Sequence, residues 1–301
     1  MTLDATSLRS SAPATQPVRG RGRGHRSPLA AIGLHAALIT SSVIAVFPVF
    51  WVAVTSFKPD SKAIEATPSL FNESGLQNYR DILTGQRGPF LTWFGNSVLI
   101  AAATTVLAVL LAASTAYAAS RFRFPGRGKL MLSFLIIQMF PFAVLIVPLY
   151  NLLLKLGLQG SWFGLVLVYC STAIPFCTYM LKGYFDSIPA DIDEAGRVDG
   201  LNPFGVFWRL VLPLAKPGLA VTGFYAFIIA WSEVAFASAF LSASDESKTL
   251  AVGLQLFVQQ NRAEWGHLSA ASILVAIPAV VVFYVVQRFL VSGLSAGSVK
   301  G

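Results

Sequence analysis

The sequence has few charged residues: Asp, Glu, Lys and Arg make up 12% of 301 residues, whereas a soluble domain carries about 25%. Hydrophobic residues make up 55%. A larger core does not account for this deficit, because a globular protein in water still needs a polar surface. The composition therefore excludes an ordinary soluble domain and predicts that lipid surrounds much of the chain.

Residue types that bind metals or catalyse reactions are also scarce. The two cysteines, Cys170 and Cys177, lie in one uncharged run, and the three histidines (His25, His35 and His267) are scattered. The seven-residue spacing of the cysteines predicts two buried free thiols on one helix face rather than a metal site. No metal ligand is predicted, and the absence of a His/Cys/carboxylate cluster in the sequence argues against a membrane-embedded enzyme.

The sequence lacks features of three other kinds of segment or protein: an ATPase, a cleaved signal peptide and an ion-coupled transporter. There is no G-x-x-x-x-G-K-[ST] phosphate loop, so the chain is not itself an ATPase. The apolar segment after Arg26 is too long for a cleaved signal peptide and has no cleavage site of small residues. An ion-coupled secondary transporter would need more intramembrane carboxylates than Glu233, and usually an inverted repeat, which the sequence does not show.

The hydrophobic residues form long runs. Five runs lack any charge: 27–57, 88–120, 130–154, 156–181 and 265–287. Each exceeds the ~20 residues that cross ~30 Å of hydrocarbon as a helix. A sixth segment, 218–241, is apolar except for Glu233. We therefore predict an all-α integral membrane protein with six transmembrane helices, at about 30–57, 92–119, 130–154, 160–182, 218–241 and 268–290.

The basic residues predict the orientation. Fifteen of the 22 Lys and Arg residues fall on the side of the membrane that carries both termini, and seven fall on the other side. The positive-inside rule therefore places both termini in the cytoplasm. Residues 1–28 are rich in Ser, Pro, Arg and Gly, and we expect a disordered basic tail ahead of a membrane domain at 29–301. An RNA-binding role for its Arg-Gly repeat is the less favoured alternative, and no nucleic-acid partner is expected.

The segment between the fourth and fifth predicted helices, residues 187–215, predicts two short helices. Ser187 and Asn202 are expected to cap them, with a proline in each first turn, and Gly200 is expected to end the first helix in a left-handed conformation. Four residues at helical spacing predict one apolar stripe on the second helix: Phe204, Phe207, Trp208 and Val211. These residues alone leave open a pair of helices lying in the membrane interface or a docking surface for a soluble partner.

The spacing within this loop resembles a known family motif. Glu194-Ala195-Gly196 is followed after three residues by Gly200, and after nine more by Leu210-Val211-Leu212-Pro213. The pattern closely resembles the EAA motif of ABC importer permeases, which is Glu-Ala-Ala, three residues, Gly, nine residues and Ile-x-Leu-Pro. Gly196 departs from the usual Ala, and Leu210 from the usual Ile.

The resemblance implies a type I importer fold, in which this coupling loop fits a cleft of an ATPase subunit. The residues expected to couple the subunits are Glu194, Ala195, Gly196, Asp199, Gly200, Leu201, Pro203, Phe204, Leu212 and Pro213.

Other stretches resemble carbohydrate permeases. The segment 287–301 is similar to the ends of such chains, and 232–234, 249–253 and 265–266 are similar to maltose/maltodextrin permease subunits. The resemblance covers about residues 30–301. It implies a multi-pass subunit of the bacterial cell membrane with no cofactor of its own. The implied substrate is maltose or maltodextrin, and the alternative is trehalose or another oligosaccharide. The implied partners are a second permease, two ATPases that bind ATP and Mg, and an extracytoplasmic solute-binding protein.

Four residues in the predicted helices are candidates for the translocation path: Glu233, Gln138, Asn96 and Trp231. An isolated acid such as Glu233 is costly in lipid, so it should face a cavity or a partner; the alternative is a position near the outer interface or a pairing with the second permease. Trp231 is a candidate for stacking on a sugar ring, although aromatic residues are common near membrane interfaces.

Overall fold

The computed structural model describes residues 28–62, 75–241, 244–259 and 262–297. The predicted basic tail, 1–28, lies outside the described residues except for Pro28. The chain divides into two compact units, Met1–Val49 and Phe50–Gly301, and the boundary falls inside the first helix.

Within the described residues, four helices are long and apolar enough to cross a membrane: α1 (Pro28–Ser56), α3 (Phe90–Arg121), α6 (Trp162–Ser187) and α13 (Trp265–Gly297). These helices cover the segments predicted as spans at 30–57, 92–119, 160–182 and 268–290. Two bent pairs of helical segments raise the number of candidate spans to as many as six. The described structure is helical apart from a two-residue antiparallel pair, β1 (Val258–Gln259) and β2 (Arg262–Ala263).

The predicted continuous helix at 130–154 is wrong in one respect, because the chain bends sharply in its middle. Helix α4 (Arg127–Gln138) is followed by η2 (Phe142–Leu145) and α5 (Ile146–Lys155), and the two halves differ in direction by 97°. The break is at Pro141, which lacks an N–H and disfavours a helical conformation for the preceding residue. The predicted span 218–241 is interrupted too, since α10 (Lys216–Ser232) ends just before Glu233 and α11 (Ala235–Phe240) begins two residues after it.

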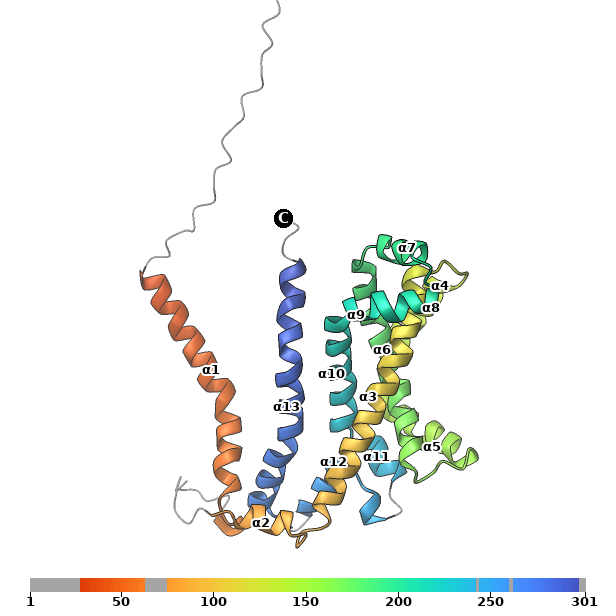
Figure 1. Cartoon of the computed structure of the whole chain (residues 1–301). Coiled ribbons are helices and arrows are strands. Elements are labelled where there is room, and N and C mark those ends of the chain that lie inside the picture. The colour runs from red at the N-terminus through yellow and green to blue at the C-terminus, as the bar shows by residue number, and fades with distance from the viewer. Residues whose placement is uncertain (1–27, 63–74, 242–243, 260–261, 298–301) are drawn as a thin grey trace, which may run out of the picture. The chain divides into compact units, whose positions relative to one another are not determined.

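The centre of the second unit is the packing of α3 against α6 and α10 (Figure 1). Small residues of α3, among them Ala101 and Ala112, are fully buried, and their size lets the helices pack closely. Cys170 and Cys177 are buried free thiols on α6, as predicted. The first lies against the α3 carbonyl of Thr104 and the second against a carbonyl of α10, which explains their seven-residue spacing.

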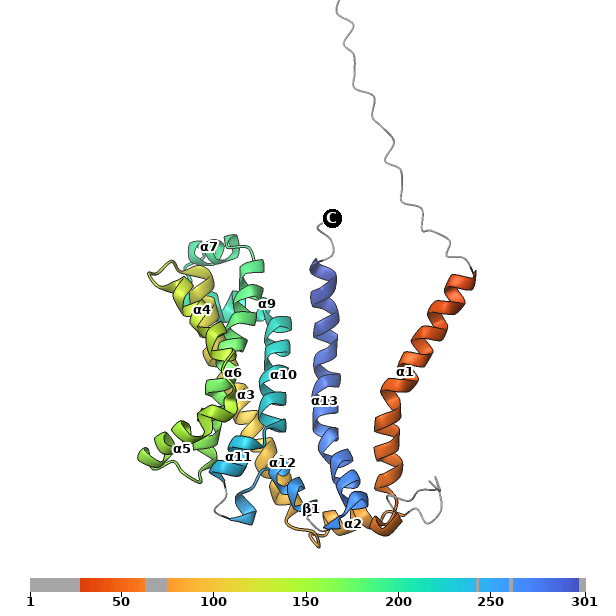
Figure 2. The same cartoon turned by 180° about the vertical axis from the view of Figure 1, so that it is seen from behind.

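The coupling loop lies at one end of this packed group. Helix α7 (Asp191–Val198) is followed by α8 (Pro203–Val206), the π-helical turn η3 (Phe207–Val211) and α9 (Leu212–Leu214). In both views α7 and the start of α4 lie at this end, while α5 and α11 lie at the other (Figures 1 and 2). The remaining elements belong to the far end: η1 (Asp60–Lys62), α2 (Gln77–Leu83), η4 (Asp245–Ser247), α12 (Leu250–Gly253) and η5 (Leu254–Phe257).

At that far end the fold gathers a His/carboxylate cluster that sequence analysis missed. His267 Nδ1 lies 2.6 Å from Asp60 Oδ2, and its Nε2 lies 3.3 Å from Asp81 Oδ2. Glu264 belongs to the same cluster, so the expectation that no such cluster exists is wrong; its members are separated by up to 207 positions in sequence.

The bonds within this cluster give it a structural role. Asp60 Oδ1 also accepts hydrogen bonds from the backbone N–H groups of Gly266 and His267, and Glu264 pairs with Arg87 at 2.7 Å. These groups are therefore already engaged with one another and with the backbone. They fasten η1 and α2 to the first turn of α13.

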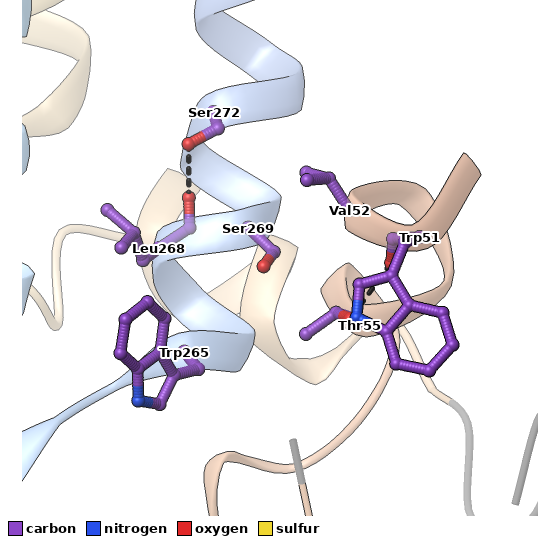
Figure 3. Close-up of a pocket in the computed structure, with 7 residues that line it drawn as sticks. All are labelled: Trp51, Val52, Thr55, Trp265, Leu268, Ser269 and Ser272. Carbon is purple, nitrogen blue, oxygen red and sulfur yellow. Dashed lines mark hydrogen bonds between the residues drawn. The ribbon is translucent and has the colours of Figure 1, made fainter. Parts of the chain in front are cut away.

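A cavity of about 370 Å³ lies beside this cluster, between the end of α1 and the start of α13 (Figure 3). Trp51 and Trp265 flank it, and both are partly exposed. The hydroxyls of Thr55 and Ser272 donate to carbonyls of their own helices. Because these polar atoms are already paired, the two side chains offer the cavity mainly apolar surface. Tryptophans at helix ends are typical of the membrane–water boundary, and we infer that these ends lie there.

Candidate functional site

The first helix of the coupling loop begins later than predicted. Ser187 does not cap it, because α6 continues to Ser187, whose hydroxyl donates to the carbonyl of Tyr184; α7 begins at Asp191. The end of α7 is as predicted. Gly200 has φ +84°, and the N–H groups of Gly200 and Leu201 donate to the carbonyls of Arg197 and Gly196. This pattern closes the helix and turns the chain towards α8.

The second helix of the loop begins as predicted and then departs from the prediction. Asn202 Oδ1 accepts from the N–H of Gly205 at 2.7 Å, which confirms the cap. The predicted single apolar stripe is wrong: Phe207 and Val211 are buried, whereas Phe204 is 70% and Trp208 41% exposed. The π-helical turn at 207–211 changes the angle between successive side chains, so residues at helical spacing face different directions.

Most of the predicted coupling residues lie at the surface. Gly196 is buried and Leu201 and Leu212 are half-buried, while the others are exposed: Glu194, Ala195, Asp199, Gly200, Pro203, Phe204 and Pro213. Val198, which was not predicted, is 87% exposed between them. The loop thus presents Val198, Phe204 and Trp208 together with acidic side chains at one end of the helices.

The two departures from the family motif lie against each other. A Cβ atom added to Gly196 would lie 2.5 Å from Leu210 Cδ1 and 3.1 Å from Val206 Cγ2. The missing methyl group at position 196 therefore makes room for the longer reach of Leu210. This pairing connects α7 with η3 inside the loop.

Replacing Gly196 with Ala is therefore expected to destabilise the loop by about 1–3 kcal/mol, since overpacking displaces side chains. Adding Leu210→Ile should recover much of the loss. The measurement is the thermal unfolding of the purified protein in detergent. Gly128→Ala is the matched control, because nothing lies within 4 Å of a Cβ at that position. A single variant Gly196→Ala with wild-type stability would contradict the pairing.

The loop is fastened to α3 by a buried polar contact that sequence analysis missed. Arg121 Nε donates to Asp193 Oδ2 at 2.9 Å, and Tyr117 Oη donates to Asp193 Oδ1 at 2.7 Å. In the sequence analysis, Arg121 counted only among the Lys and Arg residues that predict the orientation, and Asp193 was not singled out. Nothing in their spacing shows that residues 72 positions apart meet.

Glu233 lies at the break between α10 and α11. Its carboxylate accepts hydrogen bonds from Tyr169 Oη at 2.8 Å and from the N–H groups of Phe236 and Ala237. The carboxylate therefore caps α11 within the interrupted span. It accepts hydrogen bonds from backbone N–H groups that lack helical carbonyl acceptors because of the break. Its side chain is partly buried.

The other three path candidates also have neighbours within the chain. Asn96 Nδ2 donates to the carbonyls of Glu246 and Lys248, and Gln138 Nε2 donates to the carbonyl of Thr172. Trp231 is 5% exposed and its ring is stacked on Phe227, with centroids 5.5 Å apart. These candidates touch different parts of the second unit, and their contacts connect helices and loops.

The fold is that of a helical membrane subunit with a loop of short helices, 187–215, at one end of its helices. Residues 108–296, more than half of the chain, match the profile of the family "Binding-protein-dependent transport system inner membrane component", and the protein belongs to this family. It is thus a multi-pass inner-membrane permease subunit of an ABC importer, not itself an enzyme, and ATP is bound by the partner ATPase.

Individual relatives align along most of the chain. The Escherichia coli inner membrane ABC transporter permease protein YcjP is 38% identical, covering 92% of this chain and 99% of its own. The Mycobacterium tuberculosis trehalose permease protein SugB is 36% identical (85% and 93%), and the Bacillus subtilis maltodextrin permease protein MdxG is 40% identical (70% and 76%). A chain of a bacterial ABC transporter for alginate import shares the fold, with a TM-score of 0.72 and 22% identity over 86% of this chain and 96% of that one.

Proposed function

We propose that this protein is one of two different permease subunits of a sugar importer, and that residues 187–215 dock with an ATPase subunit. The observation that carries the docking is the exposed apolar surface of the loop, where Val198 is 87% and Phe204 70% exposed. Apolar side chains held out by a rigid segment in water mark a protein contact. The complete importer has two permeases, two ATPases and a solute-binding protein outside the cell.

The proposed orientation places both termini and the loop in the cytoplasm. It follows from the distribution of Lys and Arg and brings the loop to the side where ATP is available. Transport then proceeds by alternating access: closure of the ATPases on ATP displaces the loop, and the attached helices rock open on the outer side.

The proposed substrate is maltose or maltodextrin, with trehalose or another oligosaccharide as the alternative. The support is the likeness to relatives named for maltodextrin and trehalose. The test is a panel of these sugars titrated against the cognate solute-binding protein. Binding of maltodextrin with no binding of trehalose supports the first substrate, and the reverse result supports the alternative. An ion-coupled secondary transporter is no longer favoured, given the family.

Replacing Glu194 with Lys is expected to reduce ATP-driven uptake at least about tenfold, because loss of ~1.4 kcal/mol of coupling shifts an equilibrium by that factor. Glu194 is exposed, so the subunit should still insert into the membrane. The measurements are uptake, membrane level and co-purification of the ATPase. Lys155→Glu is the control, a charge reversal of an exposed residue at the end of α5, away from the loop. Normal uptake and normal ATPase association in Glu194→Lys would refute the docking assignment.

A further inference from the structure

One guanidinium joins three segments at the base of the coupling loop. Arg121 is the last residue of α3, and its side chain is 9% exposed. Its Nε binds the carboxylate of Asp193 on α7, while Nη1 and Nη2 donate to the carbonyls of Phe185 and Ile188 at 3.1 and 3.0 Å. We call Arg121, Asp193 and Tyr117 the Arg121 clamp.

The clamp is sealed from solvent. The side chain of Asp193 is 5% exposed, and both of its oxygens are used, one by Arg121 and one by Tyr117. The Tyr117 ring packs against Phe185 and Phe207, with centroids 6.1 and 4.9 Å away. A buried ion pair is a costly contact to break, because either partner alone remains as an uncompensated charge. The clamp therefore holds the end of α3 firmly against the loop.

The covalent chain connects the loop to α6 and α10 but not to α3. Helix α3 extends from the clamp for 32 residues, which is about 48 Å of helix. Near its opposite end, Asn96 binds the carbonyls of Glu246 and Lys248, and Ser97 Oγ accepts from the N–H of Leu250. Helix α3 is thus fastened by side chains to the loop at one end and to residues 246–250 at the other.

We infer that Arg121 is a positioning residue that makes α3 move with the coupling loop and so carries the loop's displacement to the segment 246–250 at the far end. The inference rests on the proposed docking of the loop with the ATPase. A purely structural clamp would fix the fold and leave the relation between ATP hydrolysis and transport unchanged. A clamp that transmits the displacement determines how much ATP is hydrolysed for each sugar transported.

The experiment uses the complete importer in liposomes and measures ATP hydrolysed per sugar taken up. Arg121→Met alone leaves the Asp193 carboxylate buried without its partner, so the main variant combines Arg121→Met with Asp193→Asn, which removes both charges and keeps an acceptor for Tyr117. This variant is expected to assemble and hydrolyse ATP, while ATP consumed per sugar rises about fivefold or more, the lower range of couplings between sites. Assembly with a wild-type ratio overturns the inference.

Two further variants complete the design. Arg121→Lys keeps the positive charge but not the forked bonds to the carbonyls of Phe185 and Ile188, and it should raise the same ratio. If the double variant does not assemble, Arg121→Lys decides the question by the same criterion. The matched control is Lys182→Met with Asp186→Asn, which removes an ion pair of α6 at the same end of the helices but keeps an acceptor for Ser120 of α3, and its ratio should remain wild type.

The result separates this inference from the docking proposal. If Glu194→Lys uncouples transport while the clamp variants do not, only the role of Arg121 fails. If Glu194→Lys has no effect and no ATPase co-purifies, the function proposed for the loop fails as well.

Discussion

Replacing Gly253 with Ala is expected to lower the free energy of unfolding by about 3 kcal/mol, the upper range for overpacking a close-packed site. A Cβ at this position would lie 2.2 Å from Cε3 of Trp93. The indole has little freedom to move: it is fully buried, its Nε1–H donates to the carbonyl of Asp245 at 2.6 Å, and Gly88 lies against its other edge. Thermal unfolding in detergent measures the change.

The controls for Gly253 are available nearby. Gly95→Ala lies on the same helix as Trp93, with nothing within 4 Å of the added methyl group, and should be close to neutral. Adding Trp93→Phe to Gly253→Ala should recover part of the loss by shrinking the ring, although the bond to Asp245 is lost. A wild-type melting temperature for Gly253→Ala would show that Gly253 and the Trp93 ring do not pack as described.

Replacing Glu233 with Ala is the second change with a large expected effect. It removes the acceptor of three hydrogen bonds, from Tyr169 and from the N–H groups of Phe236 and Ala237. An orphaned buried donor costs about 1–3 kcal/mol, so we expect a loss of at least about 3 kcal/mol. Glu233→Gln keeps one side-chain oxygen and should lose less. The measurements are thermal unfolding of the purified importer and sugar uptake.

Two companion variants locate the effect of Glu233. Tyr169→Phe removes one of the three bonds and should cost about 1 kcal/mol. Ser232→Ala, which removes an exposed hydroxyl next to the break, should change little. If Glu233→Ala remains as stable as wild type but abolishes uptake, the carboxylate acts in the translocation path rather than as a helix cap.

Several features of the fold could be predicted because they are local. Uncharged runs predicted the four long helices, since length and composition decide whether a segment can cross lipid. Gly200 and Asn202 predicted a helix end and a helix start, because their effect depends on neighbours within a few residues. The same local argument failed at Ser187, which is the last residue of α6 and not the cap of α7.

The bends were harder to predict. Pro141 was visible in the sequence, yet prolines also lie inside α1, α6 and α13, which remain single helices. Whether a proline bends a helix slightly or breaks it depends on what satisfies the freed carbonyls, and neighbouring helices supply those groups. The interruption at Glu233 also depends on neighbouring elements, because Tyr169 on α6 and the start of α11 stabilise the Glu233 carboxylate together.

The sequence by itself determined that this protein crosses a membrane and carries a loop with the spacing of the EAA motif, since both follow from composition and from fixed spacings over a few dozen residues. Only the tertiary structure decided which residues fasten that loop. Arg121 meets Asp193, Gly196 makes room for Leu210, and His267 joins Asp60 and Asp81. These contacts depend on how helices pack, and packing brings together residues whose separation in sequence carries no periodic signal.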